Sequence, residues 1–507
     1  MFRKILIANR GEIAVRIVRA CREMGITSVA VYSDADRAAL HVRLADEAYP
    51  IGPAPSRESY LRIDKLIDVS RRASCDAVHP GYGFLAENPE FAQACTENNI
   101  TFIGPLPAAM ELLGSKTAAR QLAARAGVPT VPGVQNPIEH LQDAEQAARE
   151  LGYPVLLKAV AGGGGKGMRL VREQAHLPTA WREACSEALH AFGDARVYLE
   201  RFLERPRHIE IQIFGDTHGH IVHLGERECS VQRRHQKVIE ESPSAVVGPE
   251  LRRAMGDAAV RLAREAGYTN AGTVEFLVDS AQNFYFLEVN VRLQVEHPVT
   301  EMVTGLDLVK LQIRIAAGEA LPFTQDDVVV SGHAIECRLY AEDPENNFYP
   351  SPGKILSWRT PSGPGIRLDE GVYEGFTVPT DYDPLLGKLI AWGRDRAEAI
   401  ARLQRALAEC NVTVIKTNAA LFRRILHDPE FVRCEIFTRW LDDRLPYLRE
   451  KSETANERDS VAEDATIIAA LLHHIDTNGT TKQGVAAAER ESLWKREARL
   501  EQVNREE

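Results

Sequence analysis

Hydrophobic and polar positions along the first hundred residues follow the periods of strand and helix in turn. An apolar run over residues 4–9 precedes an amphipathic segment over 12–25, and a second apolar run covers 27–33. Apolar residues three and four positions apart predict a helix between two buried strands. The alternation continues to about residue 105, which predicts a doubly wound α/β domain. Only one glycine occupies its first strand-to-helix turn, so we expect this domain to serve mainly as a scaffold.

The pattern changes near Gly114. Ser115 is suited to cap a helix, and Lys116 then lies in the first turn, where a positive charge is unfavourable unless an anion is near. Further on, period-two runs predict strands over 196–203, 207–243 and 273–298, and helical periods predict helices over 249–267 and 307–318. A strand-rich region follows residue 330. After residue 447 the chain becomes polar, and short amphipathic helices are predicted over 463–475 and 491–507.

A glycine-rich loop interrupts two apolar runs between Leu156 and Val171. Its glycines at 162–165 and 167 flank Lys166, and glycine lets backbone N–H groups approach an anion closely. A P-loop would need Ser or Thr after the lysine, and a dinucleotide-binding loop would open a helix rather than a strand. The pattern therefore predicts a hairpin that closes over a nucleoside triphosphate. A surface hairpin without a ligand is the alternative.

A second signal is the alternation of polar and aliphatic residues from Glu288 onward. Glu288, Asn290, Arg292, Gln294 and Glu296 alternate with aliphatic residues, which predicts one continuous strand with its polar residues on one face. Across a predicted turn, Glu275 lies on the partner strand, close enough to share a cation with Glu288. Two carboxylates and an amide oxygen are suitable ligands for Mg²⁺ or Mn²⁺. The solvated face of a surface strand would give a similar alternation.

Composition restricts the classes of partner. The 507 residues are 44% hydrophobic and 26% charged, so three or four globular domains are expected. A net charge of −11 disfavours nucleic acid and anionic membranes, and no segment has the roughly 18 apolar residues of a membrane span. The start lacks a secretory signal, and the eight cysteines lack CxxC spacing; both predict a cytoplasmic protein with reduced thiols. In this acidic chain the basic segment 227–241 predicts an anion-binding surface, the alternative being a solvated basic face.

Six segments together resemble biotin carboxylase, a member of the ATP-grasp family: residues 9–17, 79–92, 158–168, 207–216, 227–241 and 288–302. The resemblance covers about residues 1–446. It implies a mixed α/β protein with a Rossmann-like domain over 1–114, an ATP-grasp domain over 115–330 whose lid spans about 131–203, and a C-terminal domain over 331–446. Residues 447–507 would form a polar linker and a helical tail.

The resemblance also implies roles for individual residues. ATP would be bound by Lys116, Lys158, Gly162, Gly163, Gly164, Gly165, Lys166, Gly167, Glu200, Arg201, Leu203, His208, Gln232, His235 and Leu277. Two Mg²⁺ or Mn²⁺ ions would be held by Glu275, Glu288 and Asn290. Bicarbonate would be bound by Lys237, Arg292, Gln294 and Val295. Glu296 would be the general base, Arg338 would stabilise negative charge on biotin, and Tyr82 would lie against the biotin ring.

The implied activity is ATP-dependent carboxylation of biotin by bicarbonate through carboxyphosphate. Carboxylases that carry their own biotin attach it to a lysine flanked by methionines, and the last methionine here is Met302. We therefore expect a separate biotin carboxyl carrier protein and carboxyltransferase subunits as partners of a homodimer, as in the acetyl-CoA carboxylase of fatty acid biosynthesis. The alternatives are the biotin carboxylase component of a pyruvate carboxylase and another ATP-grasp ligase that forms an acyl phosphate, such as a carbamoyl-phosphate-forming enzyme. A regulatory or scaffolding protein that binds a nucleotide without catalysis is a further one.

Overall fold

The computed structural model describes residues 1–134, 136–160 and 168–449. Met1–Leu448 form one compact unit. The predicted tail helices over 463–475 and 491–507 lie outside the described residues, and so do the glycines and Lys166 of the glycine-rich loop.

The N-terminal region contains a five-stranded parallel sheet in the order β3-β2-β1-β4-β5. Its elements are β1 (Lys4–Ile7), α1 (Gly11–Glu23), β2 (Thr27–Ser33), α2 (Leu40–Leu44), β3 (Glu47–Gly52), α3 (Ile63–Arg72), β4 (Ala77–His79), α4 (Pro89–Glu97) and β5 (Thr101–Phe102). Alternate residues of β1 face opposite layers: Ile5 and Ile7 pack with α1, whereas Leu6 packs with α3 and α4. The predicted doubly wound arrangement is confirmed.

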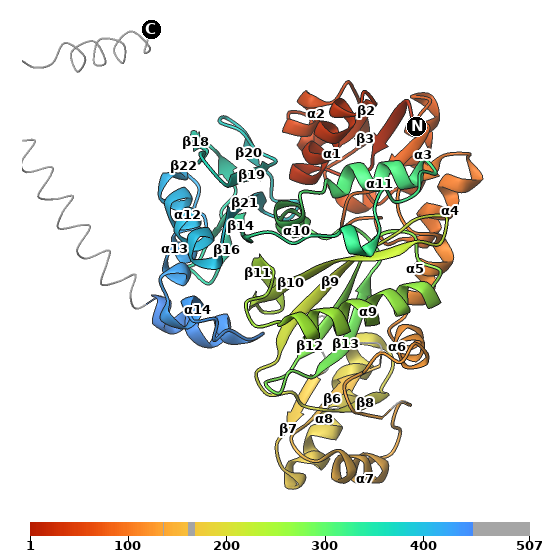
Figure 1. Ribbon diagram of the computed structural model, residues 1–507, viewed down its shortest axis with the longest axis vertical. Helices are drawn as coiled ribbons and strands as arrows, with labels where there is room; N and C mark the ends of the chain where they lie inside the picture. The colour runs from red at the N-terminus through yellow and green to blue at the C-terminus, as the bar shows by residue number, and fades with distance from the viewer. Residues whose placement is uncertain (135, 161–167, 450–507) are drawn as a thin grey trace, which may run out of the picture. The chain divides into compact units, whose positions relative to one another are not determined.

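An eight-stranded sheet in the order β13-β12-β9-β10-β11-β14-β21-β19 occupies the centre of the unit (Figure 1). Its strands are β9 (Arg207–Gly215), β10 (Ile221–Arg233), β11 (Gln236–Ser242), β12 (Asn270–Val278), β13 (Phe284–Asn290), β14 (His333–Tyr340), β19 (Ile366–Glu370) and β21 (Leu385–Gly393). β11 pairs with β14, so the sheet crosses the predicted boundary at residue 330 without interruption. The domain boundaries themselves stay a prediction.

Helices pack against one part of this sheet, and a large apolar core lies between them and the strands. The helices are α5 (Pro107–Gly114), α6 (Lys116–Arg125) and α9 (Pro249–Glu265), and α11 (Leu308–Ala316) packs against α1 and β12. Met255 and Leu262 of α9 pack against Ile209 and Phe276 of the sheet. The predicted cap of α6 is confirmed, because the Ala118 backbone N–H donates to Ser115 Oγ at 3.4 Å.

One strand prediction is wrong. β13 ends at Asn290, and residues 291–296 are irregular up to α10 (His297–Thr304). Glu296 is the residue preceding the first turn of α10 and has φ −80° and ψ 12°, so the chain must leave the extended conformation before it. Val291 and Leu293 are still buried, but Val295 is only half-buried. The period of two therefore reports a strand only as far as Asn290.

The segment around the glycine-rich loop forms a three-stranded antiparallel sheet in the order β7-β6-β8. β6 (Val155–Ala159) and β7 (Met168–Val171) flank the loop, and β8 (Val197–Arg201) pairs with β6. α7 (Leu141–Leu151) and α8 (Leu177–Phe192) pack against this sheet and contribute Ala148 and Ala184 to its core. The predicted strands on either side of the glycines are confirmed.

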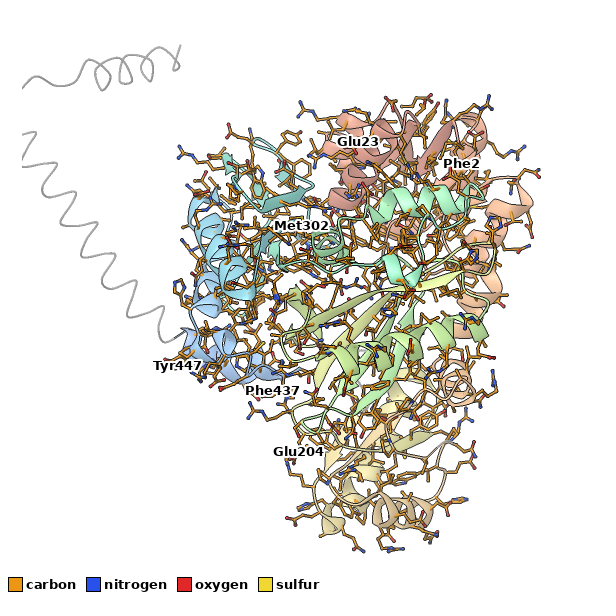
Figure 2. All side chains as sticks on the ribbon, viewed as in Figure 1. Phe2, Glu23, Glu204, Met302, Phe437 and Tyr447 are labelled. Atoms are coloured by element: carbon orange, nitrogen blue, oxygen red, sulfur yellow. The ribbon has the colours of Figure 1, made fainter. Side chains whose placement is uncertain are left out.

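The C-terminal region is rich in strands, as predicted. It contains β15 (Glu342–Asp343), β16 (Tyr349–Pro350), β17 (Gly353–Lys354), β18 (Ser357–Arg359), β20 (Thr377–Val378) and β22 (Asn411–Thr413), followed or interrupted by α12 (Arg396–Glu409), α13 (Ala419–Leu426) and α14 (Pro429–Val432). Met302 of α10 (labelled in Figure 2) packs against a small cluster formed by Val299, Val303, Ala334 and Ile390. α10 thereby packs against β21 and against β14, the strand that carries Arg338.

Candidate active site

Charged residues form a row across four neighbouring strands of the larger sheet. Glu288 on β13 is opposite Glu275 on β12, Glu275 is opposite Glu210 on β9, and Glu210 is opposite Arg227 on β10. Residues in register on adjacent strands face the same side of a sheet. The row is stabilised by Lys237 of β11, whose Nζ donates to Glu210 at 2.5 Å and to Glu275 at 2.8 Å. The predicted pairing of Glu275 with Glu288 is confirmed.

Glu296 lies between two cations at the end of this row. Lys237 Nζ donates to Glu296 Oε1 at 2.8 Å, and Arg338 Nη2 donates to Glu296 Oε2 at 2.9 Å. Burial alone would raise the pKa of this fully buried carboxyl, but Lys237, Arg338 and Arg227 outweigh burial and hold the pKa well below its ordinary value. The carboxylate is therefore ionised at neutral pH, which is the state that a general base requires.

The segment that joins β13 to α10 directs its polar side chains toward this cluster although it is not a strand. Asn290 Nδ2 donates to Glu275 Oε1 at 2.8 Å, and Gln294 Nε2 donates to the same oxygen at 3.3 Å. Arg292 Nη1 donates to Gln294 Oε1 at 2.9 Å. Asn290, Arg292 and Gln294 are thus connected with Glu275 by side-chain contacts rather than by a common strand face.

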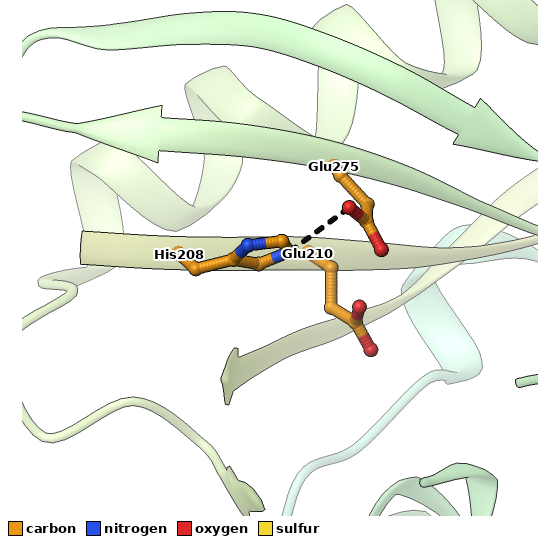
Figure 3. A group of neighbouring side chains, drawn as sticks. All are labelled: His208, Glu210 and Glu275. Atoms are coloured by element: carbon orange, nitrogen blue, oxygen red, sulfur yellow. Dashed lines mark ion pairs between the residues drawn. The ribbon is translucent and has the colours of Figure 1, made fainter. Parts of the chain in front are cut away.

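A ring nitrogen of His208 lies close to the carboxylates of Glu210 and Glu275 (Figure 3). Its Nε2 lies 3.0 Å from Glu275 Oε2, and Gln232 Nε2 lies 3.1 Å from His208 Nδ1. His208, Glu210 and Glu275 each offer a ligand atom within 4.8 Å of the others. Burial and the neighbouring Glu275 raise the pKa of Glu288, which means that these carboxylates repel each other. A divalent cation would relieve that repulsion, so the donors fit such an ion.

One cavity of about 470 Å³, called the first cavity below, lies between β6, β8, α6 and the end of β13. Lys116, Lys158, Glu200 and Glu288 line it. Lys158 Nζ donates to Glu200 Oε2 at 2.5 Å, and Arg120 also pairs with Glu200. These residues were predicted to bind ATP or metal, with the exception of Arg120.

Other predicted ATP-binding residues lie outside the lining of this cavity as far as the described residues define it. Arg201 is exposed at the end of β8, Leu203 lies two residues further on, and Leu277 is half-buried on β12. His235 is exposed in the turn between β10 and β11. The roles proposed for these residues stay predictions.

The second cavity, of about 480 Å³, lies between the N-terminal sheet and the C-terminal strands. Tyr82, Arg292, Val295 and Arg338 line it, which brings together four residues predicted to bind bicarbonate or biotin. Asn9, Arg10, Glu12 and Ile13 of the N-terminal region also line it, together with Tyr340 and Tyr382. The N-terminal region therefore contributes side chains to the same cavity as Arg338, and whether it serves mainly as a scaffold stays a prediction.

Sequence reasoning missed several residues that organise the site. Glu210 alternates with His208 and Gln212 along β9, a period-two signal that could have identified it. Glu240 of β11 accepts from Arg338 Nε at 2.7 Å, and Glu87 accepts from the Val291 N–H at 3.2 Å and lies 3.2 Å from Arg292 Nε. Glu87 ends the turn at 84–87 and gave no signal of its own, because only the tertiary fold brings it to Arg292.

Three parts of the chain match models of known protein families. Residues 1–110 match the biotin carboxylase N-terminal domain, residues 115–324 match the ATP-binding domain of the carbamoyl-phosphate synthase L chain, and residues 336–443 match the biotin carboxylase C-terminal domain. The chain belongs to the biotin carboxylase family. The central match is to an ATP-binding domain alone, and the two flanking matches separate this chain from carbamoyl-phosphate-forming ligases.

Named relatives agree with this assignment. The chain is 53% identical over 442 residues to a biotin carboxylase of Nostoc, covering 87% of this chain and 99% of the relative. It is also 53% identical over 444 residues to a pyruvate carboxylase subunit of Methanothermobacter thermautotrophicus, covering 87% of this chain and 90% of the relative. The chain is therefore an enzyme of ATP-dependent biotin carboxylation.

Solved structures show the same fold. A biotin carboxylase–β,γ-ATP complex from Campylobacter jejuni superposes with a TM-score of 0.83 at 46% identity, covering 87% of this chain and 99% of that chain. The biotin carboxylase domain dimer of 2-oxoglutarate carboxylase from Hydrogenobacter thermophilus, with MgADP, ADP and bicarbonate, superposes with a TM-score of 0.82 at 46% identity, covering 88% and 98%. No helix among the described residues is long and apolar enough to span a membrane.

Proposed function

We propose that this biotin carboxylase transfers the carboxyl group of bicarbonate to biotin on a separate carrier protein, through carboxyphosphate, as the first half-reaction of an acyl-CoA carboxylase. The observation that carries the proposal is the position of Glu296. It contacts Lys237 and Arg338 at 2.8 and 2.9 Å, and Arg338 lines the second cavity. Lys237 in turn contacts Glu275, which is opposite Glu288 of the first cavity. One polar cluster therefore connects the two cavities.

The first step joins two anions, so its site must supply positive charge. We place the ATP phosphates beside Lys116 and Lys158 in the first cavity, and bicarbonate beside Lys237 and Arg292. A bicarbonate oxygen attacks the γ-phosphorus, the bond from phosphorus to the ADP oxygen breaks, and Glu296 takes the proton of bicarbonate. Fixed cations at this point stabilise the transition state without reorganisation.

The donors around Glu275 also fit divalent cations. Glu275, Glu288 and Asn290 would hold two Mg²⁺ or Mn²⁺ ions, which supply charge neutralisation for the phosphate oxygens when bound. The raised pKa of Glu288, caused by burial and by Glu275, is the feature that favours this assignment.

The second step takes place in the second cavity. The ureido nitrogen of biotin attacks the carboxyl carbon of carboxyphosphate, the carbon–oxygen bond to phosphate breaks, and phosphate leaves with the proton of that nitrogen. Negative charge develops on the ureido oxygen, and Arg338 is held in place to stabilise it by Glu240 and Glu296. Tyr82 lines the same cavity and is available to pack against the bicyclic ring.

The final acceptor and the partners rest on the relatives. We propose a homodimer that works with a biotin carboxyl carrier protein and carboxyltransferase subunits in the cytoplasm, with acetyl-CoA as the acceptor. The near-complete coverage of the Nostoc biotin carboxylase supports a separate carrier. A role in a pyruvate carboxylase is the second candidate, because the Methanothermobacter protein is equally similar in sequence. The eight cysteines are free thiols, and five of them are buried, in keeping with a reducing compartment.

The test is cleavage of ATP by the purified full-length chain with free biotin and bicarbonate. We expect ADP release that requires bicarbonate and rises severalfold with biotin. Cleavage that ignores biotin, or that rises with an amine acceptor instead, would contradict the proposal. Supplying the carrier protein from an acetyl-CoA system or from a pyruvate system, and measuring which one becomes carboxylated faster, then separates the two candidate acceptors.

A further inference from the structure

A buried cation lies beneath the second cavity, and the mechanism above does not use it. Lys388 of β21 is 0% exposed, and its Nζ donates to the Val295 carbonyl oxygen at 2.8 Å. On the sheet, Lys388 is directly opposite Arg338. A lysine is rarely buried unless its charge is paired, so this position requires a specific partner.

That partner comes from the N-terminal domain. Glu12 of α1 is 3% exposed, and its Oε1 lies 3.3 Å from Lys388 Nζ. Among the described residues its carboxyl group makes this ion pair but no hydrogen bond. Glu12 also belongs to the lining of the second cavity. The pair therefore connects the first helix of the chain to the C-terminal strands at the floor of the proposed biotin site.

The Val295 carbonyl belongs to residues 291–296, the irregular segment between β13 and α10. β13 ends at Asn290, so residues 291–296 have no strand partner to fix their backbone. Other contacts to this segment include the Val291 N–H, which donates to Glu87 at 3.2 Å, and the Gln294 and Glu296 carbonyl oxygens, which accept from the His297 and Val299 N–H groups at 3.3 Å. Lys388 supplies the contact next to Glu296 itself.

Lys388 also lies near the aromatic ring that lines the cavity. Its Nζ is 5.6 Å from the centroid of the Tyr82 ring, within the range of a cation–π interaction. One ammonium group thus contacts the backbone before the base, a carboxylate of the N-terminal domain and the ring of Tyr82.

We propose that Lys388, held by Glu12, is a positioning residue that fixes the Val295 carbonyl and thereby the placement of Glu296 and the bicarbonate-binding segment. Neither residue touches the reacting atoms. The inference rests on the proposed roles of Glu296 and Val295. A misplacement of about 1 Å at a reacting group can reduce a rate by about 10²-fold, so loss of this contact should be visible in turnover.

The experiment compares Lys388→Met, Lys388→Arg and the double variant Lys388→Met/Glu12→Gln in the full-length chain, with Lys354→Met as the matched control. Lys354 is an exposed lysine of the C-terminal region. For each protein we would measure the unfolding midpoint, the Kd of ATP, and kcat and KM for bicarbonate in biotin-dependent ATP cleavage. The methionine keeps the length of the lysine stem and removes only the charge and the donor.

We expect Lys388→Met to lower kcat/KM for bicarbonate by about 10- to 100-fold while the Kd of ATP changes less than about 3-fold. Lys388→Met also leaves Glu12 buried without its partner, so the unfolding midpoint should fall. The double variant removes that unpaired carboxylate. It should regain the midpoint but remain slow, because the Val295 carbonyl still lacks its donor. Lys388→Arg should recover part of the activity, and Lys354→Met should match the wild type.

A different set of results would overturn the inference. If the double variant regains both stability and kcat/KM, the pair serves only the packing of the domains. If Lys388→Met is stable and fully active, Lys388 does not position the segment. Should Lys388→Met not fold, Glu12→Gln decides: a bicarbonate KM raised by about 3-fold or more supports the inference, and an unchanged KM refutes it. A wild-type chain without biotin-dependent cleavage would instead contradict the proposed function itself.

Discussion

The two cavities are nearly equal in volume, about 470 and 480 Å³, but they are built differently. The first is lined almost entirely by the stretch 116–200 with the end of β13. The second is lined by Ser56, Gln236 and separate segments within residues 9–13, 82–84, 292–295, 338–340 and 381–385. The first cavity is thus formed within the central part of the chain. The second forms only when the N-terminal, central and C-terminal parts of the chain come together.

The two cavities also differ in how they affect the pKa of a buried carboxyl group. In the first cavity, burial would raise the pKa of Glu200, but Lys158 and Arg120 outweigh it and lower the pKa. In the second, burial raises the pKa of Glu12 to about 7 despite Lys388. The first cavity therefore keeps an ionised pair at its wall and suits a triphosphate, whereas burial in the second favours the neutral form of Glu12.

The largest expected effect is that of replacing Glu296, which should reduce turnover without weakening ATP binding in the first cavity. Glu296→Gln keeps the shape of the side chain but cannot accept the proton, so turnover in biotin-dependent ATP cleavage should fall by about 10²–10⁴-fold. The Kd of ATP should stay within about 3-fold of the wild type, because Glu296 is not among the described residues lining the first cavity. Steady-state cleavage and equilibrium ATP binding measure the two quantities.

Glu250→Gln is the matched control, since Glu250 is exposed at the start of α9. It should resemble the wild type in both measurements. Wild-type turnover in Glu296→Gln would remove Glu296 as the base, and a large loss of ATP affinity would show that the two cavities are not independent.

The same contrast explains what could be predicted from the sequence. The glycine-rich hairpin, Lys158 and the pairing of Glu275 with Glu288 follow from local periods, because each depends on one or two adjacent strands. Glu87 and Lys388 gave no local signal, because they reach the site only through contacts between regions far apart in the chain. The alternation after Asn290 misled for a related reason: the start of α10 at His297 overrides the strand period.

A smaller effect tests the first cavity alone. Lys158→Met removes a cation that lines it, and a hydrogen bond to a charged group contributes about 1.5–3 kcal/mol. We therefore expect ATP to bind about 10- to 100-fold more weakly, with the KM for biotin unchanged. Arg120 would still pair with Glu200, so the fold should tolerate the change. An equal rise in the KM for biotin would show that ATP and biotin do not bind independently in the two cavities.

The free energy of unfolding should depend on pH through His79, which precedes Tyr82 of the second cavity by three residues. His79 ends β4 just before the turn that carries Tyr82, and burial, with Arg16 nearby, lowers its pKa from 6.5 to about 3. The unfolded chain therefore binds more protons than the folded chain between these values, so the stabilising contribution is complete above about 6.5 and is lost as pH falls. At pH 5 it should be smaller by about 2 kcal/mol.

Denaturant unfolding at pH 7 and pH 5 measures this loss, and His79→Gln provides the comparison. The variant keeps a neutral polar side chain but cannot take up a proton, so its loss between the two pH values should be smaller by about 2 kcal/mol. Equal losses in both proteins would mean that His79 is not held neutral by the fold.

The smallest expected effect concerns the Tyr82 hydroxyl. It is buried, and among the described residues it has no hydrogen-bond partner. Removing such a group is close to neutral, and phenylalanine retains the ring near Lys388. Tyr82→Phe should therefore change the free energy of unfolding by less than about 0.5 kcal/mol and leave the KM for biotin nearly unchanged, whereas Tyr82→Ala should raise that KM because the ring itself is lost. A large rise in the biotin KM of Tyr82→Phe would show instead that the hydroxyl bonds to the substrate, and the second cavity would then bind its ring through polar contacts as well as shape.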